Sequence, residues 1–368
     1  MSSRIGAIMT TSAFQQINFK PLTAGIYLAI ILLLLGGGIG ESLQAQSISG
    51  IGTTAASFLK VGIGARALAM GEAYTTLAED ATGVFWNPGA TANLEKTQAQ
   101  YFHEGYLADI SYDFGAISLP VNGLGTMSAF LGYMDFGQIE RTSIQFQDGT
   151  GEKVSASSFV FGLSYARALT DRFSIGGNMK YVHEGIWHST AGGYAFDIGL
   201  LYKTMFKNIR IGMSITNFGS RMKMEGRDMQ VQHDLDASIA GNNPNINAHL
   251  DTDEFPMPVL FRVGLSANIT KDILDMSGTD WIVAVDAVHP SDNNEYINAG
   301  TELALFNRII ALRTGFRQYL LDDRLGGPTF GAGIQLESGG SQIGVDFASI
   351  SYGGWFGYKN VLTVIVSF

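Results

Sequence analysis

Two short stretches carry residue types that could bind a metal ion or cleave a peptide bond. His103-Glu104-Gly105 and His183-Glu184-Gly185 repeat the same three residues in different parts of the chain. A zinc protease of the His-Glu-x-x-His type needs a second histidine four residues after the first, and a further ligand beyond it. Both stretches lack that spacing. We therefore expect no metal site here and place both stretches at a solvated rim of the fold.

Glycine pairs near the start could be mistaken for phosphate-binding loops. Gly50-Ile-Gly52 and Gly62-Ile-Gly64 do not follow a strand, and neither leads into Gly-Lys-Ser or Gly-Lys-Thr. No Gly-x-Ser-x-Gly stretch with partners for a nucleophilic serine stands out either. The sequence therefore predicts a protein that is not an enzyme and that uses no cofactor.

Three charged residues stand in a segment of small apolar residues. Arg66 precedes Glu79 and Asp80 by a sequence separation that corresponds to about four turns of an α-helix. A charge that is removed from water is costly unless an opposite charge compensates it. We expect Arg66 and these acids to join the segment to itself or to the residues around it. The alternative is that all three face water.

Composition narrows the kind of fold that could position these residues. Only 15% of the 368 residues are charged, the net charge is −10, glycine occurs 46 times and cysteine is absent. Globular soluble domains carry about 25% charged residues. The acidic balance argues against nucleic acid as a partner, and the lack of cysteine excludes disulfides and thiolate metal sites.

The first 45 residues have the features of an export signal. Arg4 and Lys20 precede an apolar run from residue 26 to 35, and Leu43-Gln44-Ala45 offers a cleavage site with small residues. The run is shorter than the roughly 20 residues that a membrane-spanning helix needs. We expect residues 1–45 to be a cleaved signal peptide rather than an anchor.

From residue 97 to 368 the chain alternates apolar and polar residues with period two, which is typical of strands. We expect fourteen strands, which begin near residues 98, 111, 125, 156, 172, 190, 208, 258, 281, 294, 309, 328, 341 and 360. Long connections, chiefly residues 136–155 and 218–257, alternate with tight turns. This alternation on an even strand number favours an outer-membrane barrel over a β-sandwich.

The last predicted strand supports a transmembrane barrel. Leu362, Val364, Val366 and Phe368 form one wholly apolar face. A final strand that ends on an aromatic residue is similar to the signal that the barrel assembly machinery reads in bacterial outer-membrane proteins. We therefore expect Phe368 to act as that signal, and outer-membrane lipid to surround the barrel.

A barrel of fourteen strands encloses a lumen that its own side chains cannot fill. Residues 46–96 precede the first strand and show helical spacing at Ala67, Met70, Tyr74 and Leu77. Asn87 followed by Pro88 is typical of a helix start. The sequence therefore predicts an all-β, fourteen-stranded antiparallel transmembrane β-barrel with a small N-terminal helical hatch in the lumen.

Three stretches of this hatch resemble the PorV/PorQ family, a branch of the FadL-like outer-membrane proteins. They are Gly64-Ala-Arg66-Ala-Leu-Ala-Met70-Gly71, Ala78-Glu79-Asp80-Ala and Trp86-Asn87-Pro88. The resemblance implies that these residues form a structural or gating motif. It also implies a role in type IX secretion, in which the barrel binds the C-terminal domains of exported cargo or the secretion machinery.

The resemblance leaves a second function open. FadL-like barrels transport hydrophobic small molecules, such as long-chain fatty acids, across the outer membrane. The chain also departs from the stricter PorV pattern, because Ala69 and Gly89 stand where glycine and alanine are usual. The outer connections 136–155 and 218–257 suit the binding of a protein, and the three methionines of the longer one suit adaptable apolar contacts.

Overall fold

The computed structural model describes residues 50–368 apart from residues 109, 237, 239–242, 244, 275–277 and 322–323. The predicted signal peptide, residues 1–45, therefore lies outside the described residues. Within the described part of the chain, no helix is both long enough and apolar enough to cross a membrane.

Fourteen antiparallel strands form a closed barrel, in which β1 pairs with both β2 and β19, and β5 pairs with β6. The predicted fold class is confirmed, and each predicted strand start lies within three residues of the observed one. The barrel strands are β1 (Gln98–Gly105), β2 (Ser111–Val121), β3 (Gly125–Glu140), β4 (Lys153–Thr170), β5 (Phe173–Ile186), β6 (Ser189–Lys203), β7 (Arg210–Gly219), β13 (Leu260–Asn268), β14 (Asp280–Pro290), β15 (Tyr296–Leu305), β16 (Ile310–Tyr319), β17 (Pro328–Ser338), β18 (Ser341–Ser351) and β19 (Tyr358–Ser367).

The barrel wall exposes apolar side chains and buries charged ones, which is the reverse of the distribution in a soluble protein. On β16, Leu312 is 50% exposed whereas the next residue, Arg313, is 6% exposed. On β18, Phe347 is 45% exposed and Asp346 is 1% exposed. Apolar side chains thus point out and charged side chains point into the lumen, which is the arrangement that a lipid surrounding requires.

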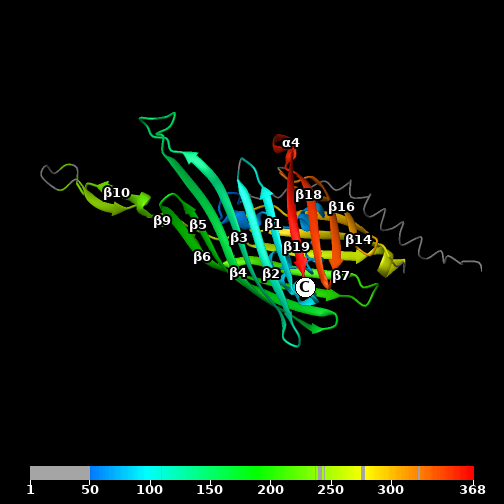
Figure 1. Ribbon diagram of the computed structural model, residues 1–368. Helices are drawn as coiled ribbons and strands as arrows, with labels where there is room; N and C mark the ends of the chain where they lie inside the picture. The colour runs from blue at the N-terminus through cyan, green and yellow to red at the C-terminus, as the bar shows by residue number, and fades with distance from the viewer. Residues whose placement is uncertain are drawn as a thin grey trace, which may run out of the picture. The chain divides into compact units, whose positions relative to one another are not determined.

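The N-terminal segment, residues 50–97, packs inside the ring of strands (Figure 1, blue). Its short helices are η1 (Ser57–Lys60), α2 (Ala65–Ala69), α3 (Gly83–Trp86) and η2 (Pro88–Asn93). The helical spacing predicts a longer helix than α2. The helix ends early because Gly71 and Glu72 have left-handed backbones, with φ of 63° and 64°. That turn brings Gly71 against the barrel wall.

The end of the chain differs slightly from the predicted last strand. Strand β19 ends at Ser367, and Phe368 follows it with a side chain that is 60% exposed. The amide of Phe368 donates a hydrogen bond of 2.9 Å to the carbonyl of Thr97. The apolar face of the predicted strand does point outward, since Leu362 is exposed while Thr363 is buried.

One of the two long connections is shorter than predicted. Strands β3 and β4 continue past a bulge between Asp135 and Gln138, so the connection spans residues 141–152 rather than 136–155. A bulge lets a ladder continue with a changed direction.

We call the other long connection, residues 220–259, the long outer loop. It contains the short elements β8 (Met222–Lys223), β9 (Glu225–Gly226), η3 (Arg227–Met229), β10 (Gln230–His233), β11 (Ile246–His249) and β12 (Glu254–Phe255). Two further short elements interrupt other connections: η4 (Ile269–Ile273) and α4 (Gly353–Phe356).

Candidate functional site

The surface along which the N-terminal segment meets the lumen wall, here called the luminal seam, concentrates the buried charges of the molecule. Arg66 on α2 forms a bidentate ion pair with Glu302 on β15. Nε donates to Oε2 at 2.8 Å, and Nη2 donates to Oε1 at 2.9 Å. Glu302 is completely buried. A two-pronged bond of this kind fixes direction as well as distance.

Glu302 is shared among several cations of the wall. Arg313 donates from Nε to Oε2 at 2.6 Å, and Arg308 donates from Nη2 to Oε1 at 3.0 Å. Arg313 in turn holds Asp346 at 2.6 Å. The seam therefore contains a chain of alternating charges in which each buried carboxylate has a cation beside it, which offsets the cost of removing it from water.

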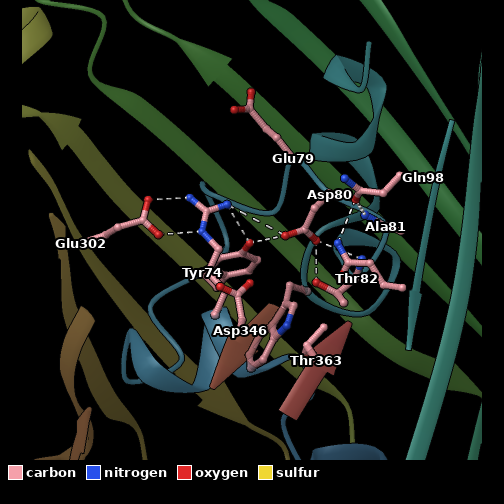
Figure 2. Close-up of polar contacts among 12 residues, drawn as sticks. Tyr74, Glu79, Asp80, Ala81, Thr82, Gln98, Glu302, Asp346 and Thr363 are labelled. Carbon is pink, nitrogen blue, oxygen red and sulfur yellow. Dashed lines mark hydrogen bonds and ion pairs between the residues drawn. The ribbon is translucent and has the colours of Figure 1, made fainter. Parts of the chain in front are cut away.

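Tyr74 joins Arg66 to Asp80, and Figure 2 shows Glu302 on one side of Tyr74 and Asp80 on the other. The hydroxyl of Tyr74 donates to Asp80 and accepts from Nη1 of Arg66 at 3.1 Å. Asp80 also accepts from the amide of Thr82 at 2.9 Å. Asp80 therefore stabilises the turn that leads into α3, and it contacts Arg66 chiefly through Tyr74, since the direct Arg66–Asp80 separation is 4.0 Å.

Burial controls the protonation of this group. It raises the pKa of the Tyr74 hydroxyl well above its usual value, although the charge of Arg66 opposes that rise. Burial by itself disfavours the charged form of Arg66, but the negative charge of Glu302 holds the pKa of Arg66 above its usual value. Tyr74 is therefore a neutral hydrogen-bond bridge between a cation and an anion.

Asn87 makes the predicted helix start and also ties the segment to the wall. Its Oδ1 accepts from the amide of Gly89 at 3.1 Å, and Pro88 occupies the first position of η2. Its Nδ2 donates to the carbonyls of Thr75 at 2.8 Å and Leu200 at 2.9 Å. Asn87 is fully buried, so each of these bonds satisfies a group that water cannot reach.

Trp86 and Met70 form the apolar part of the seam. The indole nitrogen of Trp86 donates to the carbonyl of Ile63 at 3.1 Å, and its ring packs edge-on against Tyr74 and Phe85. Met70 is fully buried in the same hydrophobic cluster. Predicted residues from the first and the second half of the segment thus meet in one core.

Glu79 makes separate contacts from its neighbour Asp80. It pairs with Arg210 at the start of β7, and with Lys203 at the end of β6 at 3.4 Å. Figure 2 shows the Glu79 side chain apart from the group around Tyr74. The adjacent acids therefore attach the segment to different parts of the wall.

Glycines on the lumen face of the wall let the N-terminal segment lie directly against the strands. A Cβ on Gly71 would lie 2.5 Å from the amide nitrogen of Phe316, and a Cβ on Gly315 would lie 2.7 Å from Cα of Gly71. A Cβ on Gly89 would similarly lie 2.7 Å from the carbonyl carbon of Gly199. Backbone cannot yield to such contacts. The wall glycines that face the segment in this way are Gly176, Gly199, Gly212, Gly264, Gly300, Gly315 and Gly331.

The wall partners of the segment were not among the residues predicted from the sequence. Asp286 on β14 accepts from the amides of Tyr74 at 2.9 Å and Thr75 at 2.8 Å, and Arg317 on β16 holds Glu72 at 2.7 Å. A signal was available, because these charges alternate with apolar residues in strands expected to face lipid. Such charges must point into the lumen.

The His-Glu-Gly stretches lie near the ends of β1 and β5, but one prediction for them is wrong. Glu104 is fully buried rather than solvated, and its Oε1 accepts from the hydroxyl of Tyr352 at 2.8 Å. It is buried because it alternates with exposed His103 and so faces the lumen. Glu184 accepts from the amide of Ala56 at 3.0 Å. Among the described residues, no group of three His, Cys, Asp or Glu side chains is placed to hold a metal ion.

The long outer loop is anchored at its base and exposed beyond it. Met222 and Met257 are buried, and the carbonyl of Pro256 accepts from the amide of Ala55 at 3.0 Å. Farther out, β10 and β11 pair with each other in a two-stranded sheet. Figure 1 shows β10 well away from the barrel strands.

A family model and solved structures of other proteins are similar to this chain. The model of the family described as type IX secretion system protein PorV matches residues 44–237. Among solved structures, the chain is similar to a FadL homologue of Pseudomonas aeruginosa, with 10% identity, a TM-score of 0.51, and coverage of 84% of this chain and 98% of that one. It is also similar to the toluene transporter TodX of Pseudomonas putida, with 12% identity, a TM-score of 0.48, and coverage of 78% and 92%. No protein of curated function matches it.

Proposed function

This chain belongs to the PorV family of type IX secretion system proteins, and we propose that it is a non-enzymatic binding component of protein secretion in the bacterial outer membrane. It holds exported cargo, through the cargo's C-terminal domain, or a part of the secretion machinery. The family membership supports this role. The FadL-like fold by itself does not, since one fold serves several functions.

The long outer loop is the part that carries the proposal. Its β10–β11 hairpin has Leu235 and Leu250 exposed at 75% and 55% beside it. In the described part of the loop each of these strands pairs with the other alone, so each has a free edge. A free edge can accept a strand from a partner, with backbone hydrogen bonds supplying affinity and the neighbouring apolar side chains supplying selectivity.

The N-terminal segment has a separate task in the proposal. We assign residues 1–45 to a cleaved signal peptide and residues 46–96 to a hatch that closes the lumen. Arg66, Met70, Gly71, Glu79, Asp80, Trp86, Asn87 and Pro88 hold the hatch in place. The many contacts of the luminal seam support a hatch that stays seated while cargo is bound outside.

The test is capture from native outer membranes. The tagged chain is crosslinked in cells and purified, and the proteins and lipids that accompany it are identified by mass spectrometry. A variant in which residues 230–249 are replaced by a short Gly-Ser linker should lose the secreted or secretion-machine partner. A matched variant with residues 143–150 replaced in the same way is the control for loop shortening. Equal capture by the wild type and the 230–249 variant would sink the hairpin proposal.

One observation favours a second function, FadL-like transport of a hydrophobic small molecule. An apolar groove of about 340 Å³ lies on the outer face of the wall and is lined by Phe261, Val263, Ala287, Ile297 and Leu320, among others. Tyr296 lines this groove and also a cavity at the mouth of the lumen. Lipid or fatty acid recovered from the purified barrel, with no protein partner, would favour transport over secretion.

A further inference from the structure

A cavity of about 250 Å³ lies at the mouth of the lumen where the chain forms the wall from β13 to β16. The N-terminal segment supplies one side through Lys60 and Glu72, and the wall supplies the other through Tyr296 and Arg317. Tyr106 follows β1 and closes a third side. The cavity is smaller than the pockets that hold drug-sized ligands.

The charges that line this mouth cavity compensate one another. Lys60 Nζ pairs with Asp292 Oδ2, and Arg317 Nη1 pairs with Glu72 Oε1 at 2.7 Å. Because each cation already has an anion beside it, the cavity offers little net attraction to either an anion or a cation. Its specificity must come from hydrogen bonds and from shape.

Hydrogen-bonding capacity remains unused at the same place. Asp292 and Arg317 are 1% and 5% exposed, yet Oδ1 of Asp292 and Nε of Arg317 have no hydrogen-bond partner in the protein. Each unmade bond of a buried group costs free energy. Both atoms are themselves buried, so a molecule in the cavity gains these bonds only where a small shift of the two side chains exposes them. One orphan is an acceptor and the other is a donor. A hydroxyl group can satisfy either.

The aromatic residues supply flat apolar surface next to these polar groups. The guanidinium of Arg317 lies 4.7 Å from the centre of the Tyr352 ring, and Tyr106 packs edge-on against the same ring at 5.4 Å. Arg317 therefore already occupies the place that a ligand cation would take over Tyr352. The rings of Tyr106 and Tyr296 carry hydroxyls that can bond a ligand while their faces contact its C–H groups.

From this cavity we propose a binding site for one sugar ring, a neutral ligand rich in hydroxyl groups. A pyranose has C–H faces for the tyrosine rings and vicinal hydroxyls that both donate and accept. The site opens on the same side of the barrel as the long outer loop, since it is formed by the connections at that end. The sugar can come from a free saccharide or from the head of a glycolipid. The proposal goes beyond the secretion role and does not depend on it.

The experiment measures binding of methyl pyranosides of glucose, galactose, mannose and N-acetylglucosamine to the full chain, by saturation-transfer NMR and calorimetry. The protein is kept in a polyoxyethylene detergent, because glycoside detergents would occupy the site. We expect at least one pyranoside to bind, and glycine and phosphate to bind far more weakly. Tyr106→Phe and Tyr296→Phe should each weaken binding about five- to tenfold, the value of one hydrogen bond. Tyr194→Phe, on the lipid face, should stay within about twofold of the wild type.

The result that overturns the site is failure of all four pyranosides to bind the wild type at about 10 mM, a concentration that corresponds to very weak affinity. Binding that both cavity variants leave unchanged would also overturn it, as would tighter binding of glycine or phosphate. Heat-modifiable gel migration of each variant shows that the barrel is folded. The binding measurement is then repeated with nanodiscs that contain a glycolipid with the same sugar as its head. Tighter binding to the glycolipid than to the free glycoside identifies a glycolipid as the ligand, and the reverse identifies a free saccharide.

Discussion

The luminal seam draws its contacts from strands all round the barrel, whereas the long outer loop is anchored at its base and then leaves the wall. In the seam, charged groups such as Glu302 are fully buried and satisfied by partners from both sides. In the loop, Leu235 and Leu250 are exposed. The comparison indicates that the same chain contains one region built to remain in place and one built to meet another molecule.

The largest effect is expected from a substitution that separates segment and wall. Gly315→Leu puts a side chain where the backbone of Met70 and Gly71 lies, with Cα of Gly71 only 2.7 Å from the new Cβ. The backbone on both sides cannot yield, so we expect the N-terminal segment to leave the lumen. Planar-bilayer recordings should then show large, stable openings that the wild type lacks.

The control for this glycine is Gly115→Leu on β2, where a Cβ would meet nothing within 4 Å. It adds the same side chain to a strand glycine without touching the segment. If Gly315→Leu gives a folded barrel with the same conductance as Gly115→Leu, the tight fit of the seam does not hold the segment.

Arg66→Ala should have the next largest effect. The change removes the two-pronged bond to Glu302, but Arg313 and Arg308 still compensate that carboxylate. We therefore expect a loss of about 1–3 kcal/mol in the free energy that seats the segment, below the full cost of stranding a buried charge. Bilayer recordings should show more frequent openings. The opening frequency of Arg66→Lys should lie between those of the wild type and of Arg66→Ala, since lysine keeps the charge but cannot make the bidentate contact.

Arg167→Ala removes an exposed arginine near the end of β4 and serves as the matched control. It should behave as the wild type. Conductance of Arg66→Ala that equals that of Arg167→Ala would remove Arg66 from any gating role.

Met257→Ala tests the base of the long outer loop. Met257 is 2% exposed and lies against Gly193 with Met222. Its truncation leaves a cavity and should cost about 2 kcal/mol, at the low end for a buried methionine because the loop can adjust. Thermal unfolding followed by gel migration should show a lower midpoint. Met205→Ala, whose side chain is 82% exposed, should leave the midpoint unchanged.

The smallest effect on the barrel is expected from replacing residues 230–249 by a short linker. The hairpin lies beyond the buried methionines, so its loss should shift the unfolding midpoint by less than about 2 °C. Bilayer conductance should also stay at the wild-type value. A large fall in stability would show that the hairpin belongs to the structural core and that the long outer loop is not a separate region.

Much of the barrel could be predicted because its signal is local. Period-two alternation places each strand, and the exposed Leu312 beside the buried Arg313 shows why the pattern persists along the wall. The helix start at Asn87 and Pro88 was also predictable, since capping depends on a few neighbouring residues. The length of helix α2 was less predictable from the sequence, because α2 ends where Gly71 meets the wall rather than where the helical spacing stops.

From the amino-acid pattern alone one can derive the order of the strands and the apolar segment with Arg66, Glu79 and Asp80 that precedes them. The groups that those charges contact depend on the folded barrel. Arg66 meets Glu302, which lies 236 residues later in the chain, and no local pattern encodes such a distance. The folded barrel also decides that Glu104 is buried and that Gly315 touches Gly71. Those outcomes depend on barrel closure, which brings strands from both halves of the chain around one segment.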